Sequence, residues 1–104
     1  MPTTTIAGQT VEVNEEGFLT DPTAWNEELG TELAKLIGIE MTPEHWKIVK
    51  FLRDDYEVMG ETATLRRVST QAGVPVKELF TLFPGKPAKK MSYVAGLPKP
   101  KGCV

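Results

Sequence analysis

The sequence has few of the side chains on which enzyme active sites are commonly built. It holds one cysteine and one histidine in 104 residues. A single cysteine cannot close an internal disulfide, so nothing favours an oxidising compartment and we expect a cytoplasmic protein. His45 stands beside Glu44 at an expected helix start, where a packed or hydrogen-bonded imidazole is a simpler reading than a catalytic one. With no second histidine, no Cys-x-x-Cys pair and no glycine-rich phosphate loop, we expect neither a metal nor a cofactor.

Long apolar stretches and a strong charge of one sign are missing as well. No apolar run approaches the ~20 residues of a membrane-spanning helix, and the N-terminus lacks the basic and apolar regions of a secretory signal. The net charge is −2 and the pI about 5.4, which gives no general reason to bind nucleic acid or an anionic membrane. With 40% hydrophobic and 25% charged residues, the chain has the composition of one globular domain, which we expect to be a monomer.

The first twenty residues of the chain are typical of β-strands. Short stretches rich in threonine, valine and isoleucine surround Ala7-Gly8, and a second turn is expected at residues 14–17. These stretches predict two or three short strands in a meander. Because a two-stranded ribbon is marginally stable alone, it must pack on the helices that follow, and an α+β fold is expected.

Helix start and stop signals divide the rest of the chain into five predicted helices, at about residues 21–37, 43–59, 63–72, 75–83 and 87–94. The first two begin with a proline in the first turn, and each is followed by a glycine. The three- and four-residue spacing of large apolar side chains predicts a core that includes Trp25, Trp46, Leu52, Tyr56 and Phe80.

The two helices expected over 63–72 and 75–83 have the spacing of a helix-turn-helix unit. A DNA-reading unit needs polar side chains early in its second helix, whereas this helix starts with Pro75, Val76, Lys77 and Glu78. The acidic total also argues against DNA. A DNA-binding regulator with a redox-sensing cysteine is therefore kept as the alternative from a different class.

The chain ends in AGLPKPKGCV, which places its only cysteine, Cys103, second from the C-terminus. Proline and lysine alternate at 98–101, and residues 96–104 predict a flexible, extended arm on a globular domain of residues 1–95. Eight steps of ~3.1 Å give this arm a reach of about 25 Å. A cysteine that lies on the terminus by chance is the simpler alternative. The extended arm, whose prolines restrict its backbone, favours instead a thiol that enters a pocket on a partner.

The free thiol has no net electrostatic help from its neighbours. An unperturbed cysteine titrates near ~8.5, and the effects of Lys99 and Lys101 are offset by the terminal carboxylate. Activation therefore requires a docked environment. It could come from a partner, or from the arm folding back against Arg66 or Arg67, which we take as candidates for stabilising the thiolate.

The ending LFPGKPAKKMSYVAGLPKPKGCV resembles that of the DsrC/TusE family, which includes the gamma subunit of dissimilatory sulfite reductase. The similarity extends upstream through EEGFL at 15–19, TPEHW at 42–46 and FLRDDYE at 51–57. The resemblance implies a small β-meander packed on an orthogonal array of helices with a helix-turn-helix-like unit. It also implies a docking role for the arm residues, which are Gly96, Leu97, Pro98, Lys99, Pro100, Lys101 and Gly102.

The resemblance further implies a sulfur carrier in which Cys103 accepts sulfur as a persulfide and passes it on. Such a protein is sulfurtransferase-like rather than a stand-alone enzyme, and its expected partners are sulfur-transfer proteins or a dissimilatory sulfite reductase. Members with two arm cysteines carry the second one where this chain has Ser92, and a hydroxyl cannot exchange with a disulfide. We therefore expect the single-cysteine, TusE-like branch. The alternative within the family is a gamma-type partner of sulfite reductase that acts with an external thiol.

Overall fold

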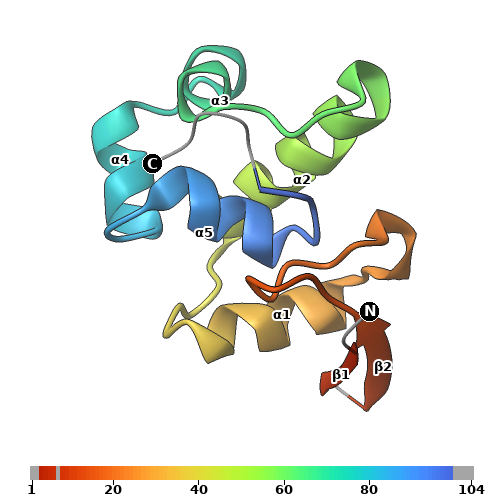
Figure 1. Cartoon of the computed structure of the whole chain (residues 1–104). Coiled ribbons are helices and arrows are strands. Elements are labelled where there is room, and N and C mark those ends of the chain that lie inside the picture. The colour runs from red at the N-terminus through yellow and green to blue at the C-terminus, as the bar shows by residue number, and fades with distance from the viewer. Residues whose placement is uncertain (1–2, 7, 100–104) are drawn as a thin grey trace.

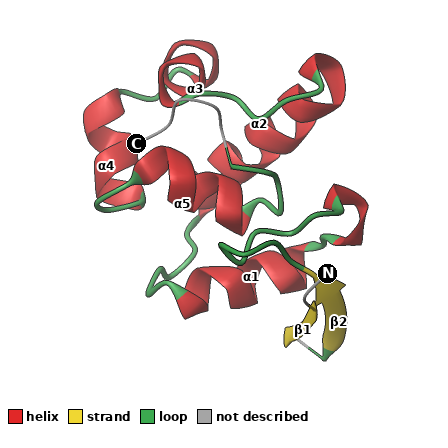
Figure 2. Ribbon diagram, in the orientation of Figure 1, coloured by secondary structure: helices red, strands yellow, loops and turns green. Residues whose placement is uncertain are grey.

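The computed structural model describes residues 3–6 and 8–99 of the chain. A two-stranded hairpin is followed by a short 3₁₀ turn, η1, and five helices, and their bounds are β1 (Thr3–Ile6), β2 (Gln9–Glu12), η1 (Pro22–Ala24), α1 (Glu27–Leu36), α2 (Pro43–Met59), α3 (Leu65–Ala72), α4 (Val76–Leu82) and α5 (Pro87–Val94). The hairpin lies beside α1, and α5 lies between α1, α2 and α4 (Figures 1 and 2). The α+β architecture expected from the sequence is confirmed.

The N-terminal β segment forms a smaller meander than the longest one expected. β1 and β2 pair antiparallel from Thr3 opposite Glu12 to Ile6 opposite Gln9. The expected turn at residues 14–17 is present, and the Asn14 side chain accepts hydrogen bonds from two backbone N–H groups after it. After this turn the described chain forms no third strand. It pairs with the segment before the turn only through an isolated antiparallel bridge between Val13 and Leu19. The apolar face of the hairpin packs on α1, in a cluster of Val11, Val13, Leu19, Leu29 and Leu33.

The first long helix begins later than the sequence predicts. The start signal at Asp21-Pro22 is genuine, since Asp21 accepts a hydrogen bond from the Thr23 N–H, but it caps only the 3₁₀ turn η1. α1 starts at Glu27, where the Asn26 side chain caps it by accepting from the Leu29 N–H at 2.8 Å. The extended backbone of Trp25 separates the two elements.

His45 has the structural role expected for it at the start of α2. Its Nδ1 accepts a hydrogen bond from the Thr42 N–H at 3.1 Å, which completes a capping box. The ring proton therefore lies on Nε2, which donates to the Leu82 carbonyl at 2.8 Å. The imidazole is buried, and it joins the start of α2 to the end of α4.

The main core lies between α2, α3, α4 and α5, and its largest fully buried members include Leu52, Leu79, Phe83, Met91 and Leu97. Trp25, Trp46 and Tyr56 are partly buried at its edge, as members of the packing expected from the sequence. Phe80 is 44% exposed, so its assignment to the core was wrong. The short helix α4 turns Leu79 and Phe83 inward instead, and a side chain one position after Leu79 points about 100° away from it.

Trp25 connects three parts of the fold. Its indole N–H donates to the Val94 carbonyl at 2.8 Å, at the end of α5. The Arg53 guanidinium of α2 lies over the ring, 4.3 Å from its centroid. The ring also covers Gly30 of α1 and Gly96 so closely that a Cβ on either would lie 2.8 Å and 2.4 Å from it. These contacts fix the direction in which the chain leaves α5.

None of the helices in the described part of the chain is both long and apolar enough to cross a membrane.

Gly96→Ala tests the close approach of Trp25. We expect it to lower the free energy of unfolding by about 3 kcal/mol, because the methyl group is strained at a φ of 71° and also meets the indole. Gly60→Ala is the matched control, with a φ of 74° and no atom within 4 Å of the added carbon; it should cost about 1 kcal/mol. Urea denaturation measures both values, and equal losses would contradict the packing role of Gly96.

Candidate functional site

The root of the C-terminal arm is part of the folded body. The Gly96 N–H donates to the Tyr93 carbonyl and the Leu97 N–H to the Ser92 carbonyl, which is the Schellman arrangement for ending a helix. Leu97 is 1% exposed and packs in the main core. The sequence predicts a flexible arm from Gly96 onward; in the structure these first residues are packed instead, because a buried leucine follows the helix-ending glycine.

Two side chains hold the next residues of the arm. The Thr62 hydroxyl donates to the Pro98 carbonyl at 2.7 Å, and the Lys99 ammonium lies 3.3 Å from a carboxylate oxygen of Glu16. Glu16 also pairs with Lys89 at 3.3 Å. Hydrogen bonds from Lys89 and then Lys99 lower the pKa of Glu16, so this carboxylate is ionised at neutral pH. The chain is therefore held to the body as far as Lys99.

The remaining site residues predicted from the sequence, Pro100, Lys101, Gly102 and Cys103, lie outside the described residues. Their predicted roles remain proposals. The structure fixes where this last part of the arm begins, which is at Lys99 on the surface of the body. The sequence alone did not give that starting point.

The two candidate arginines have different surroundings. Arg67 donates to both carboxylate oxygens of the buried Asp55, with its shortest contact at 2.7 Å, and this hydrogen bonding raises the pKa of Arg67. Its guanidinium is therefore engaged in joining α3 to α2. Arg66, the preceding residue on α3, is exposed, and among the described residues no hydrogen bond or ion pair engages its side chain. Of the two, only Arg66 is available to an incoming anion.

Ser92 stands where two-cysteine relatives would carry their second thiol. Its side chain is fully buried in α5, and its hydroxyl donates to the Ala88 carbonyl at 2.7 Å. The position is therefore inside the body rather than on a free arm. Sequence reasoning identified this residue but could not foresee its burial.

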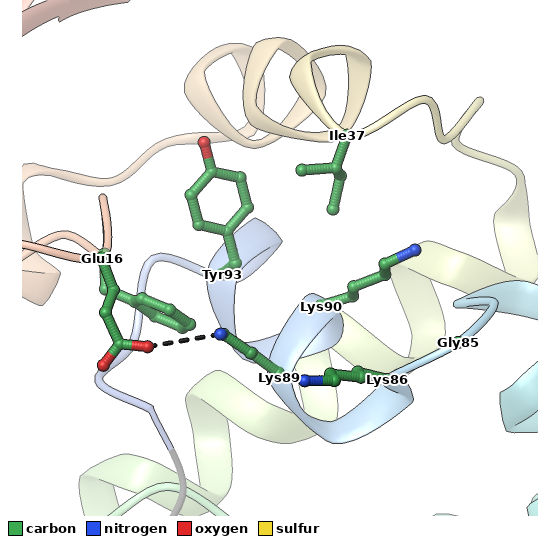
Figure 3. Close-up of a pocket in the computed structure, with 8 residues that line it drawn as sticks. Glu16, Ile37, Gly85, Lys86, Lys89, Lys90 and Tyr93 are labelled. Carbon is green, nitrogen blue, oxygen red and sulfur yellow. Dashed lines mark ion pairs between the residues drawn. The ribbon is translucent and has the colours of Figure 1, made fainter. Parts of the chain in front are cut away.

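A groove beside the arm root was not anticipated from the sequence. It has a volume of about 440 Å³ and is lined by Glu16, Phe18, Ile37, Gly85, Lys86, Lys89, Lys90 and Tyr93 (Figure 3). Phe18 and Tyr93 pack edge to face at 5.6 Å, and burial raises the pKa of Tyr93. The sequence signal that could have indicated this groove is the group of three lysines in GKPAKK. They fall within five residues of each other, around the predicted start of the last helix.

The surface of α4 bears on the DNA-binding alternative. α3 and α4 contact each other across the left-handed Gly73, as a pair of short helices should. α4, however, exposes the apolar side chains Val76 and Phe80, at 40% and 44%. A helix that reads DNA needs polar groups on this surface, so the geometry does not favour that alternative.

Within residues 3–6 and 8–99, no three histidine, cysteine, aspartate or glutamate side chains gather closely enough to hold a metal ion.

Comparison with known proteins identifies the family. A family model described as "DsrC like protein" matches residues 5–104. Sulfurtransferase TusE of Pectobacterium atrosepticum is 36% identical over 104 residues, which cover 93% of this chain and 95% of that protein. The gamma subunit of the dissimilatory-type sulfite reductase of Nitratidesulfovibrio vulgaris is 39% identical over 105 residues, which cover the whole of both chains.

Solved structures agree. The oxidized gamma subunit (DsrC) of the dissimilatory sulfite reductase from Archaeoglobus fulgidus has a TM-score of 0.85 and 36% identity, and the match covers 99% of this chain and 100% of that one. The resemblance inferred from the C-terminal motif is confirmed. Matched in sequence and in fold over nearly its whole length, the chain belongs to the DsrC-like protein family, two of whose members are named for sulfur transfer and for sulfite reduction.

Proposed function

We propose that this protein is a sulfur carrier in which Cys103 receives a sulfane sulfur as a persulfide and passes it to a partner. The observation that carries the proposal is that the arm root, Gly96 to Lys99, is held against the body. The only cysteine of this DsrC-like chain follows four residues after Lys99. A thiol at the end of a short arm with a rigid base suits transfer between pockets.

The packed root shortens the reach expected from the sequence. Cys103 lies four steps along the chain from Lys99, and a fully extended chain spans at most ~3.6 Å per step. The Cα of Cys103 can therefore lie at most about 14 Å from that of Lys99, whereas seven steps from Gly96 at the same ~3.6 Å would allow about 25 Å. A partner must bring its donor or acceptor sulfur close to the body of this protein.

The transfer step needs no cofactor. The Cys103 thiolate attacks the outer sulfur of a donor persulfide, R–S–SH, and a new S–S bond forms at Cys103 as the donor S–S bond breaks. The donor leaves as its thiolate, R–S⁻, so the step moves one sulfur atom with no external oxidant or reductant. Delivery to an acceptor is the same exchange in the opposite direction.

Arg66 is proposed as the cation that stabilises the loaded anion when the arm folds back. A persulfide is more acidic than a thiol, so it is largely anionic at neutral pH and gains from a nearby guanidinium. Arg66 is exposed and has no side-chain partner among the described residues, whereas Arg67 is held by Asp55. This difference supports Arg66 alone.

The partners are proposed to be sulfur-transfer proteins, because Ser92 removes the second thiol that would release the product within the same molecule. The identity of 39% to a sulfite reductase gamma subunit supports a second candidate, a gamma-type subunit that relies on an external thiol for release. Co-purification with a sirohaem reductase distinguishes the two.

Sulfur loading tests the proposed function. Incubation with a small persulfide donor should add the mass of one sulfur atom to the protein, and a reductant should remove it. Intact-mass spectrometry measures both, and Cys103→Ser should acquire nothing. Wild-type protein that never loads, under conditions that load a two-cysteine relative, would refute the carrier role.

Arg66 is tested in the same assay. Arg66→Ala should load more slowly or lose its sulfur faster than wild type, by roughly twofold to fivefold, as expected for one exposed charge interaction. Arg66→Lys should recover part of the effect, and Lys77→Ala, which removes another exposed cation, should leave it unchanged. An unaltered Arg66→Ala would remove this residue from the site and leave the role of Cys103 standing.

Oxidation tests the single-cysteine chemistry. Because Ser92 cannot form a disulfide, mild oxidation should yield an intermolecular disulfide dimer on a non-reducing gel, and Cys103→Ser should abolish it. A compact oxidised monomer lighter by two hydrogens would contradict the expectation.

A further inference from the structure

The groove beside the arm root concentrates positive charge that the described residues neutralise only in part. Lys86, Lys89 and Lys90 line it, and Figure 3 shows Lys89 pointing toward Glu16. Glu16 is shared between Lys89 and Lys99. Among the described residues, no carboxylate pairs with Lys86 or Lys90. On a chain with a net charge of −2, this is a local excess of cations.

Local helix stability does not account for these lysines. Lys86 is the N-cap residue of α5 and Lys90 lies in its first turn, and like charges this close together repel. Positive charge is also disfavoured in the first turn of a helix, and the first turn of α5 has no acidic residue to balance it. An arrangement that lowers local stability is expected where a surface serves binding.

The floor of the groove is apolar. Phe18 and Tyr93 form its edge-to-face aromatic pair, and Ile37 at the end of α1 completes it. The volume of about 440 Å³ would hold more than ten waters at ~30 Å³ each, so a single small anion would leave most of it unfilled. A cationic rim around an apolar floor matches a peptide that carries carboxylates beside a large apolar side chain.

We propose that this groove binds an acidic segment of a partner protein, with an apolar side chain on Tyr93 and Ile37 and carboxylates on Lys86 and Lys90. Within the protein itself, Glu16 already makes the kind of ion pair that such a carboxylate would make, because it pairs with Lys89. A nucleic acid fits less well, because its phosphates would extend beyond this cluster of lysines over a chain whose net charge is −2. The proposal rests on the described residues alone and does not depend on Cys103.

The same contacts couple the groove to the arm. A carboxylate that binds Lys89 competes with Glu16, and Glu16 is also the partner of Lys99 at the arm root. Occupation of the groove therefore leaves Glu16 to Lys99 alone and changes the last described contact of the arm. A docked partner would act on the base of the arm without touching the thiol.

The test is an NMR titration of the full-length protein with an acetylated, amidated peptide of sequence Glu-Glu-Leu-Glu-Glu. Saturable shifts should appear at the amides of Lys86, Lys89, Lys90, Tyr93 and Ile37, and their fit gives the dissociation constant. Gln-Gln-Leu-Gln-Gln tests the carboxylates, and Glu-Glu-Ser-Glu-Glu tests the apolar contact. Both control peptides should bind more weakly than the first.

Variants assign the binding to the groove. The double variant Lys86→Gln/Lys90→Gln should bind the acidic peptide roughly tenfold more weakly, while Lys77→Gln, an exposed lysine of α4 outside the groove, should match wild type. Glu16→Gln should bind it about twofold or more tightly, because the internal competitor is gone. Thermal unfolding of each variant confirms that the fold is intact.

Three results would overturn the proposal. One is an equal affinity for the acidic peptide and its glutamine counterpart. Another is a set of shifts that spreads evenly over exposed lysines outside the groove, such as Lys47 and Lys77. The third is tighter binding of a short oligothymidylate than of the peptide at the same salt concentration, which would assign the groove to nucleic acid. Since a small persulfide donor needs no groove, failed sulfur loading with intact peptide binding would count only against the proposed function.

Discussion

The position of Trp25 is the constraint on which the rest of the functional region depends. Its ring lies directly against the backbone of Gly30 and Gly96, where no side chain could fit. Its N–H holds the Val94 carbonyl, and Arg53 stacks on its face. Arg53 in turn donates to the Ala95 and Pro22 carbonyls at 2.6 and 2.8 Å. One indole and one guanidinium thus satisfy the backbone groups left at the end of α5.

This junction gives the C-terminal arm a defined origin. Burial lowers the pKa of Arg53, yet a guanidinium remains charged at neutral pH, so its contacts persist. With the end of α5 fixed, Leu97 enters the core and Pro98 meets Thr62. The described part of the arm is thus held to the body as far as Lys99. In the proposed carrier role, transfer takes place at short range, so its specificity depends on how closely a partner fits this surface.

Glu16 connects the arm root with the groove. It lies in the turn after the hairpin, far from α5 in sequence, and it pairs with lysines of both regions. Exposed ion pairs contribute little to stability, so these pairs are easily exchanged for others. That property suits a contact that an incoming carboxylate must replace. The turn that follows the hairpin thus has a proposed role beyond completing the fold, because it presents this carboxylate.

Sequence alone determined the features that depend on neighbouring residues. Helix limits at Gly60 and Gly73, the cap at Thr42 and the extent of α5 follow from local backbone preferences, and the C-terminal motif identified the family. The single thiol and the exclusion of an internal disulfide follow from composition.

Tertiary structure decided what depends on contacts through space. Arg66 and Arg67 are equivalent in the sequence, and only the approach of Asp55 from α2 separates them. The sequence places Leu97 in a flexible tail, whereas the structure buries it in the core. The sequence places Phe80 in the core, whereas α4 turns it toward solvent. Local rules fix the backbone of each element, but the partners of a side chain depend on how the elements pack, and residues distant in sequence control that packing.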